Sequence, residues 1–98
     1  MDDQQTLFLW HPDKAKENLK KHGVGFAEER TVFKDLFAQI MYDPDHSDDE
    51  YRQIIIGYSN RNRLLFVSFH ERDDGAVRLI RARQADSEER RLYEEKEQ

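Results

Sequence analysis

Three apolar segments joined by short polar links limit what this 98-residue chain can fold into more than any other feature of its sequence. They are YRQIIIGYS (51–59), RLLFVSFHE (63–71) and AVRLIRARQ (76–84), and each carries β-branched or aromatic side chains. The links are a tight turn at Asn60–Asn62 and a hairpin turn with Asp74-Gly75, a pair suited to positive φ. Consecutive strands with links this short predict an antiparallel meander.

Helical patterns precede the meander. Pro12 fits the start of a helix and Gly23 fits its end. Between them, Ala15 and Leu19 are four residues apart, and they are predicted to form the buried stripe of this helix. Residues 25–33 predict a second short helix.

The remaining elements complete an α+β prediction. Residues 6–10 suggest a first or edge strand, and residues 36–42 are strand-like. Asp86 with Glu89 matches a capping box at the start of a last helix. The unbroken run Ile54–Ile56 indicates that both sheet faces are partly covered. We therefore expect one domain over residues 1–98, with N-terminal helices and a C-terminal helix packed on a mostly antiparallel sheet.

Composition excludes several classes of protein. The chain has no cysteine, so it has no disulfide, no catalytic thiol and no cysteine-ligated metal. No segment approaches the roughly 18 apolar residues of a membrane span. The first ten residues carry no positive charge ahead of their apolar run, unlike a signal peptide. We expect a cytoplasmic protein without membrane contact, since small secreted domains usually need disulfides.

Charge is arranged in blocks beneath a net value of −5. Residues 14–34 hold six basic and three acidic side chains, and residues 61–83 hold six arginines and three acids. Residues 43–50 hold five acids and no base. The net charge alone argues against a nucleic-acid partner, but the two basic segments are compatible with one.

Metal and nucleotide sites find little support. The acidic segment begins like a calcium loop, but Asp48 stands at the glycine position and Ile54 at the position of the bidentate glutamate. The four histidines lack metal-binding spacing, and the chain has neither a glycine-rich phosphate loop nor a G-x-S-x-G elbow. We expect no metal and no cofactor.

Phosphate chemistry remains. Lys14, Asn18, Lys21 and His22 share one face of the first predicted helix. Arginine binds phosphate through two hydrogen bonds, and histidine titrates near neutrality. Metal-free RNA cleavage needs such groups: a base for the 2′-hydroxyl, a cation for the phosphate and an acid for the leaving oxygen. The residues alone equally suit a non-catalytic module that binds RNA or a partner's carboxylates.

Strand alternation sorts the arginines of the last strand. Val77, Leu79, Arg81 and Arg83 are predicted to share one face, and Arg78, Ile80 and Ala82 the other. This grouping predicts a cationic lip at positions 81 and 83, and a solvated surface charge at position 78.

Several blocks resemble the BrnT family of type II toxins. They are W-x-x-D-K-x-x-x-N-L-x-K-H-G-V-x-F (10–26), DPDHSDDEYR (43–52), LLFVSFHER (64–72), IRAR (80–83) and SEERRLYEE (87–95). The resemblance implies a RelE-like fold and a metal-independent endoribonuclease that halts translation. It also implies neutralisation by a BrnA-type antitoxin with a ribbon-helix-helix domain, through which the complex would reach operator DNA.

The resemblance and the positions of the charged residues together suggest a hypothesis for the roles of individual residues. Arg52 and Arg83 would clamp the scissile phosphate, and His22 or Glu71 would transfer protons. The substrate-binding residues would be Lys14, Asn18, Lys21, Arg72 and Arg81. Two positions depart from the family pattern, because Arg81 replaces a common serine and Tyr51 a common glutamate. These departures keep a further alternative open, an inactive toxin that acts only in operon repression.

Overall fold

The computed structural model describes residues 6–46 and 50–97, which form an α+β fold. In chain order the elements are β1 (Phe8–Leu9), α1 (Pro12–His22), α2 (Phe26–Glu29), the 3₁₀ helix η2 (Arg30–Lys34), β2 (Gln39–Tyr42), the 3₁₀ turn η3 (Pro44–His46), β3 (Gln53–Tyr58), β4 (Leu64–Glu71), β5 (Val77–Gln84) and α3 (Ser87–Glu97). The sheet order is β1-β5-β4-β3-β2, with β1 parallel to β5 and the other pairs antiparallel. The predicted fold class and meander are confirmed. None of the helices in the described residues is long and apolar enough to cross a membrane.

The helix boundaries follow the expected signals. The backbone N–H of Asp13 donates to His11 Nδ1 at 3.2 Å at the start of α1. Gly23 ends α1 with φ 68°, a left-handed conformation that glycine adopts without strain. At the start of α3, Asp86 and Glu89 form the predicted capping box, with both side-chain-to-backbone hydrogen bonds at 2.9 Å.

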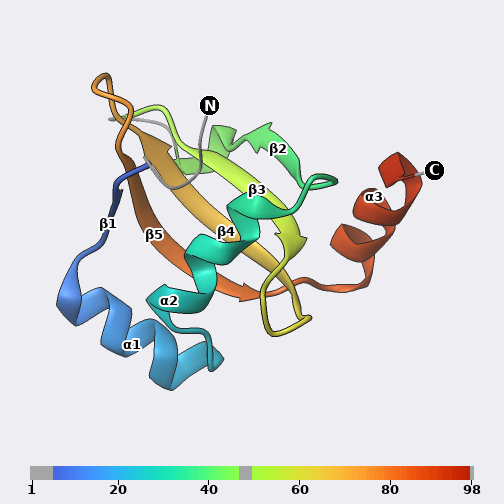
Figure 1. The fold of residues 1–98 in the computed structure, drawn as a ribbon, viewed down its shortest axis with the longest axis horizontal. Coiled ribbons are helices and arrows are strands. Elements are labelled where there is room, and N and C mark those ends of the chain that lie inside the picture. The colour runs from blue at the N-terminus through green and yellow to red at the C-terminus, as the bar shows by residue number, and fades with distance from the viewer. Residues whose placement is uncertain (1–5, 47–49, 98) are drawn as a thin grey trace.

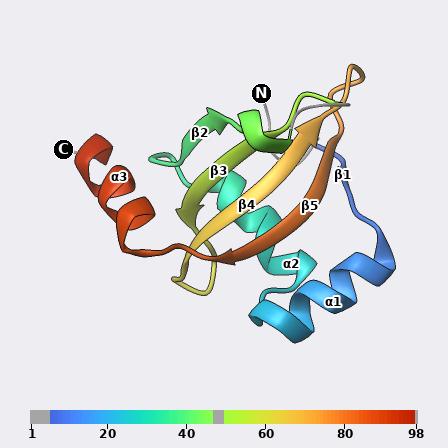
Figure 2. The same cartoon turned by 180° about the vertical axis from the view of Figure 1, so that it is seen from behind.

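Both faces of the sheet carry apolar cores. In Figure 1 α2 crosses in front of the sheet, and Figure 2 shows the sheet in front of α2 from behind. The α2 side holds the larger core, whose buried residues are Val24, Val32, Ile55, Leu65, Val67, Phe69, Val77, Leu79 and Ala82. On the opposite face, Tyr93 of α3 packs with Ile54, Ile56 and Leu64. The expectation that the isoleucine run is covered on both faces is confirmed.

The predicted buried stripe of α1 is wrong. Leu19 is 54% exposed, whereas Asn18 is 7% exposed and is the buried residue of α1. Asn18 Oδ1 accepts a hydrogen bond from the Ala82 N–H at 3.0 Å, and its Nδ2 donates to Val24 O at 2.9 Å. The reason is the short β1, which pairs with only Val77 and Arg78 of β5. Helix α1 continues along that edge, and a buried backbone N–H there needs a polar partner.

The predicted grouping of side chains on β5 is also wrong. Ser68 of β4 pairs with Arg81 while Phe69 pairs with Leu79, so Ile80 is an extra residue in β5. This bulge shifts the alternation, and Ala82 joins Leu79 in the larger core. The arginines at 78, 81 and 83 consequently lie on the opposite face. Arg78 there forms an ion pair with Glu50 and is not a solvated surface charge.

Gly57 of β3 lies where the sheet meets η2 too closely for a side chain. A Cβ atom at this position would lie 3.0 Å from Val32 Cγ1 and 3.1 Å from Ala38 Cβ. Gly57→Ala is therefore expected to lower the free energy of unfolding by about 1–3 kcal/mol, measured by urea denaturation. Gly25→Ala is the control, because its nearest contact would be 3.8 Å away at Leu19 Cδ1. Equal losses in the two variants would contradict the prediction.

Candidate functional site

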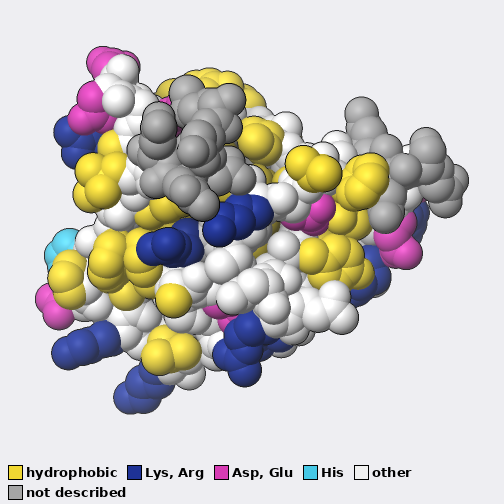
Figure 3. Space-filling view, in the orientation of Figure 1, with side chains coloured by type: hydrophobic (Ala, Val, Ile, Leu, Met, Phe, Trp, Pro, Cys, Tyr) yellow, Lys and Arg dark blue, Asp and Glu magenta, His cyan; other side chains and the backbone are white. Residues whose placement is uncertain are grey.

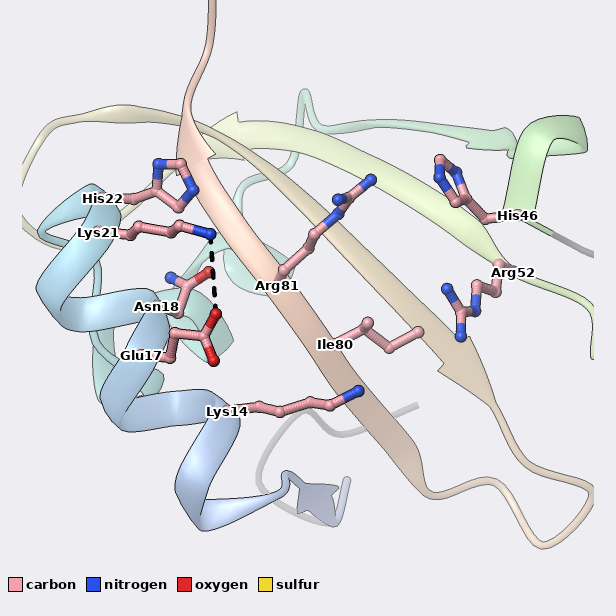
Figure 4. A pocket seen from close by; sticks show the side chains of 9 residues that line it. All are labelled: Lys14, Glu17, Asn18, Lys21, His22, His46, Arg52, Ile80 and Arg81. Atoms are coloured by element: carbon pink, nitrogen blue, oxygen red, sulfur yellow. Dashed lines mark ion pairs between the residues drawn. The ribbon is translucent and has the colours of Figure 1, made fainter.

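A hollow on the α3 side of the sheet collects most of the predicted site residues. Its volume is about 310 Å³. Figure 4 shows α1 as one wall, Ile80 and Arg81 of β5 in the middle, and His46 and Arg52 across from the helix. The predicted site residues that line it are Lys14, Asn18, Lys21, His22, Arg52 and Arg81. The bulge at Ile80 creates this arrangement by turning Arg81 away from the core.

A second hollow of about 370 Å³ adjoins the first and shares His22, His46 and Arg81 with it. Arg83 lines this second hollow, together with Phe66. The two hollows place six of the predicted cations and histidines along one surface: Lys14, Lys21, His22, Arg52, Arg81 and Arg83.

Three cations of the first hollow, Lys14, Lys21 and Arg81, form weak ion pairs or none within the described residues. Lys21 Nζ lies 3.7 Å from Glu17 Oε1, and both side chains are about two-thirds exposed, so the pair contributes little. Among the described residues, Lys14 and Arg81 have no ion-pair partner. His22 stands in the last turn of α1 together with Lys20 and Lys21. The hollow is thus suited to bind anions.

Arg83 is held by the C-terminal helix. Its Nη1 and Nη2 donate to the two carboxylate oxygens of Glu89 at 2.8 Å each, and its guanidinium lies 4.2 Å from the centre of the Phe66 ring. The hydrogen bonds that Arg83 donates to Glu89 raise the pKa of Arg83. A phosphate at Arg83 would have to compete with this bidentate pair.

Glu50 gathers a second group of charges beside the hollow. Its carboxylate accepts hydrogen bonds from Arg52 Nε at 3.2 Å and from Arg78 Nη2, and it lies 4.0 Å from His70 Nε2. Burial alone would raise the pKa of Glu50, but the hydrogen bonds from Arg78 and Arg52 outweigh it and lower the pKa. His70 Nδ1 lies 2.7 Å from the carbonyl oxygen of Tyr51, so this nitrogen carries the proton. Glu50 therefore orients Arg52 toward the hollow.

Glu71 and Arg72 lie apart from the hollow. Glu71 is exposed at the end of β4, and Arg72 donates to Asp74 Oδ2 at 2.9 Å in the β4–β5 turn. Neither lines a hollow with His22 or Arg81. Their proposed roles remain predictions.

Sequence reasoning missed the groups that complete the site, Asp43, His46 and Glu50. The signals available were short spacings, Asp43-x-x-His46 and Glu50-x-Arg52. Within the described part of the chain, no three His, Asp or Glu side chains gather in a way that could hold a metal ion. Besides the carboxylates of Glu17, Asp43 and Asp45, the two hollows gather guanidinium, ammonium and imidazole groups, which bind phosphate.

Comparison with known proteins identifies the family. The family model described as the ribonuclease toxin BrnT of type II toxin–antitoxin systems matches residues 10–89. The chain belongs to the BrnT family. It is also similar to the crystal structure of the ribonuclease toxin BrnT of Brucella abortus, at 25% sequence identity and a TM-score of 0.66. The match covers 85% of this chain and 100% of the Brucella chain. No curated protein sequence matches.

Family membership confirms the resemblance drawn from the sequence. A BrnT-family protein is a ribonuclease toxin of a type II toxin–antitoxin system, so its partner class is an antitoxin. The Brucella BrnT fold agrees with helices packed on a mostly antiparallel sheet.

Proposed function

We propose that this BrnT-family protein is an endoribonuclease that cleaves RNA without a metal ion in the hollow between α1 and β5. The observation that carries the proposal is the convergence of Lys21, His22, Arg52 and Arg81 from three separate elements on one concave surface. Cations on both walls fit a chain of phosphates better than they fit a neutral ligand.

The reaction needs a cation at the phosphate that gains charge in the transition state. Arg52 and Arg81 take this position in the proposal, and Arg83 contacts the neighbouring phosphate when Glu89 yields one of its bonds. Lys14 and Lys21 bind the flanking backbone, and Asn18 holds α1 against β5 through its hydrogen bonds with Ala82 and Val24. His22 is a proton-transfer group at the end of α1. Inhibition of translation follows when the cleaved RNA is a message.

The antitoxin in this proposal is of the BrnA type, with a ribbon-helix-helix domain that alone contacts operator DNA, and the pair acts in the cytoplasm. Exposed apolar side chains near the free β2 edge support a protein partner: Phe37 is 51% and Ile40 56% exposed. Figure 3 shows yellow side chains over this edge and near α3. Met41, the next residue of β2 after Ile40, packs against the smaller core instead. Co-purification with the product of the adjacent reading frame tests this part.

Arg81→Ala and Arg52→Ala are expected to slow RNA cleavage by about 10²–10³-fold, because each removes a cation from the transition state. The measurement is single-turnover cleavage of labelled RNA in excess EDTA. Arg91→Ala is the control, since Arg91 is exposed on α3 and outside both hollows. RNA binding without cleavage by the parent protein would instead support a binding module. Loss of cleavage by EDTA would contradict the metal-independent mechanism.

A further inference from the structure

His46 is a second imidazole in the hollow, and its orientation is fixed. It ends the turn η3 and lines both hollows, with its side chain 45% exposed. His46 Nδ1 lies 3.1 Å from Asp43 Oδ2. A carboxylate only accepts, so Nδ1 carries a proton, and in the neutral imidazole Nε2 keeps its lone pair.

Asp43 is itself held in place. It is 6% exposed, and its Oδ1 accepts the backbone N–H of Asp45 at 3.2 Å. Its own N–H donates to Arg52 O at 2.9 Å, which ties η3 to the start of β3. The imidazole of His46 is therefore oriented by a buried carboxylate that the sheet anchors. A carboxylate bound to Nδ1 also stabilises the imidazolium that forms when Nε2 takes a proton.

His22 and His46 lie on opposite sides of Arg81. Figure 4 shows His22 at the end of α1, His46 across the hollow, and the Arg81 side chain between them. All three residues line both hollows. His22 stands in the last turn of α1, beside the negative end of the helix dipole, whereas Asp43 holds the neutral His46 in the tautomer that accepts a proton at Nε2. The two histidines are thus biased toward opposite roles.

We propose that His46, positioned by Asp43, is the general base of RNA cleavage and that protonated His22 is the general acid. This inference rests on the proposed ribonuclease function. His46 Nε2 removes the proton of the 2′-hydroxyl, and the 2′-oxygen forms a bond to phosphorus. The bond from phosphorus to the 5′-oxygen breaks, and His22 protonates that oxygen. The products are a 2′,3′-cyclic phosphate and a 5′-hydroxyl, while Arg81 neutralises the charge of the phosphate between them.

The experiment compares two substrates after the cleavage position has been mapped with the parent protein. One is the RNA oligonucleotide, and the other carries sulfur in place of the leaving 5′-oxygen, since a thiolate leaves without a proton. His46→Ala and His22→Ala are each expected to slow cleavage of the oxygen substrate by about 10²–10⁴-fold. With the sulfur substrate, the cleavage rate of His22→Ala is expected to return to that of the parent, whereas the rate of His46→Ala is expected to stay low. Added imidazole is expected to restore His46→Ala in part.

Three measurements separate this role from a structural one. His11→Asn is the control histidine variant, because asparagine can still cap α1 and His11 lines neither hollow. Affinity for a non-cleavable 2′-O-methyl RNA is expected to be unchanged in His46→Ala. Asp43→Asn is expected to slow the parent but to have no further effect on His46→Ala, as for residues that act as one unit.

Each result decides a different point. Parent-like cleavage by His46→Ala would overturn the assignment of the base while the ribonuclease function stands. If the sulfur substrate restored the cleavage rate of His46→Ala but not that of His22→Ala, the assignment of base and acid would be overturned. Failure of the parent protein to cleave any RNA would overturn the proposed function and this mechanism together.

Discussion

Glu28→Ala is expected to lower the free energy of unfolding by about 3–5 kcal/mol, because it breaks a buried ion pair. Glu28 is 5% exposed. Its carboxylate accepts hydrogen bonds from Arg63 Nε at 2.9 Å, from Arg63 Nη2 and from Ser59 Oγ at 2.7 Å. Arg63 Nη2 also donates to Gly23 O at 2.9 Å. One carboxylate therefore joins α2, the β3–β4 turn and the end of α1, and its loss leaves the guanidinium of Arg63 without its anion.

Urea denaturation measures this effect against a matched arginine variant. Arg61 Nη1 lies 3.9 Å from the same carboxylate, but the Arg61 side chain is 69% exposed. Arg61→Ala is therefore expected to cost less than about 1 kcal/mol. A loss of similar size in Glu28→Ala and Arg61→Ala would show that Glu28 stabilises the fold only as a surface charge.

The same ion pair gives stability a defined pH dependence. Hydrogen bonding from Arg63 is the main cause that lowers the pKa of Glu28 below its ordinary value of 4.5, against the opposing effect of burial. A carboxyl whose pKa is lower in the folded state stabilises the protein above its unfolded pKa. That stability is lost as the pH falls through the folded pKa. Glu28→Ala is expected to remove this acid-induced loss.

Local patterns predicted the elements because their causes are local. The glycine at position 23, the Asp86–Glu89 capping box and the short links of the meander each act within a few residues. The errors came from contacts between distant segments. Asn18 is buried because β5 offers a backbone N–H at Ala82, 64 residues away in the chain. Helical periodicity contains no information about that partner.

The candidate site was predictable in its residue types but not in its geometry. Arg81 reaches the hollow because of a bulge between β4 and β5, and a bulge is a property of strand pairing. Strict alternation placed Arg81 on the wrong face. Likewise, the pairing of His46 with Asp43 depends on the turn η3, and the sequence showed only an acidic segment. Glu71 and Arg72 were predicted as site residues from a charged segment of the sequence. In the fold this segment is the end of β4 and the turn after it, away from the hollow.

Glu29→Gln is expected to have the opposite effect to Glu28→Ala, although the two glutamates are adjacent. Glu29 is 4% exposed, and among the described residues its carboxyl has no hydrogen-bond or ion-pair partner. Burial, with a smaller contribution from Glu28, raises the pKa of Glu29 from 4.5 to about 7. Ionising this carboxyl in the folded state at about pH 8 costs about 3 kcal/mol, because each unit of pKa corresponds to about 1.4 kcal/mol. Glutamine avoids that cost.

The stability that Glu29→Gln gains over the parent protein should increase as the pH rises. A raised folded pKa means that stability is fully present below the unfolded pKa of 4.5 and is lost as the pH rises through about 7. Parent and Glu29→Gln are therefore expected to unfold at similar urea concentrations near pH 4, and the variant is expected to be more stable at about pH 8. Glu94→Gln, an exposed glutamate of α3, is the control and should change neither value. If parent and Glu29→Gln keep the same difference in stability at both pH values, the pKa of Glu29 is not raised in the folded protein. A larger gain at pH 8 than at pH 4 would instead show that the two buried glutamates differ through their partners: Glu28 stabilises because Arg63 meets it, and Glu29 destabilises because no cation does.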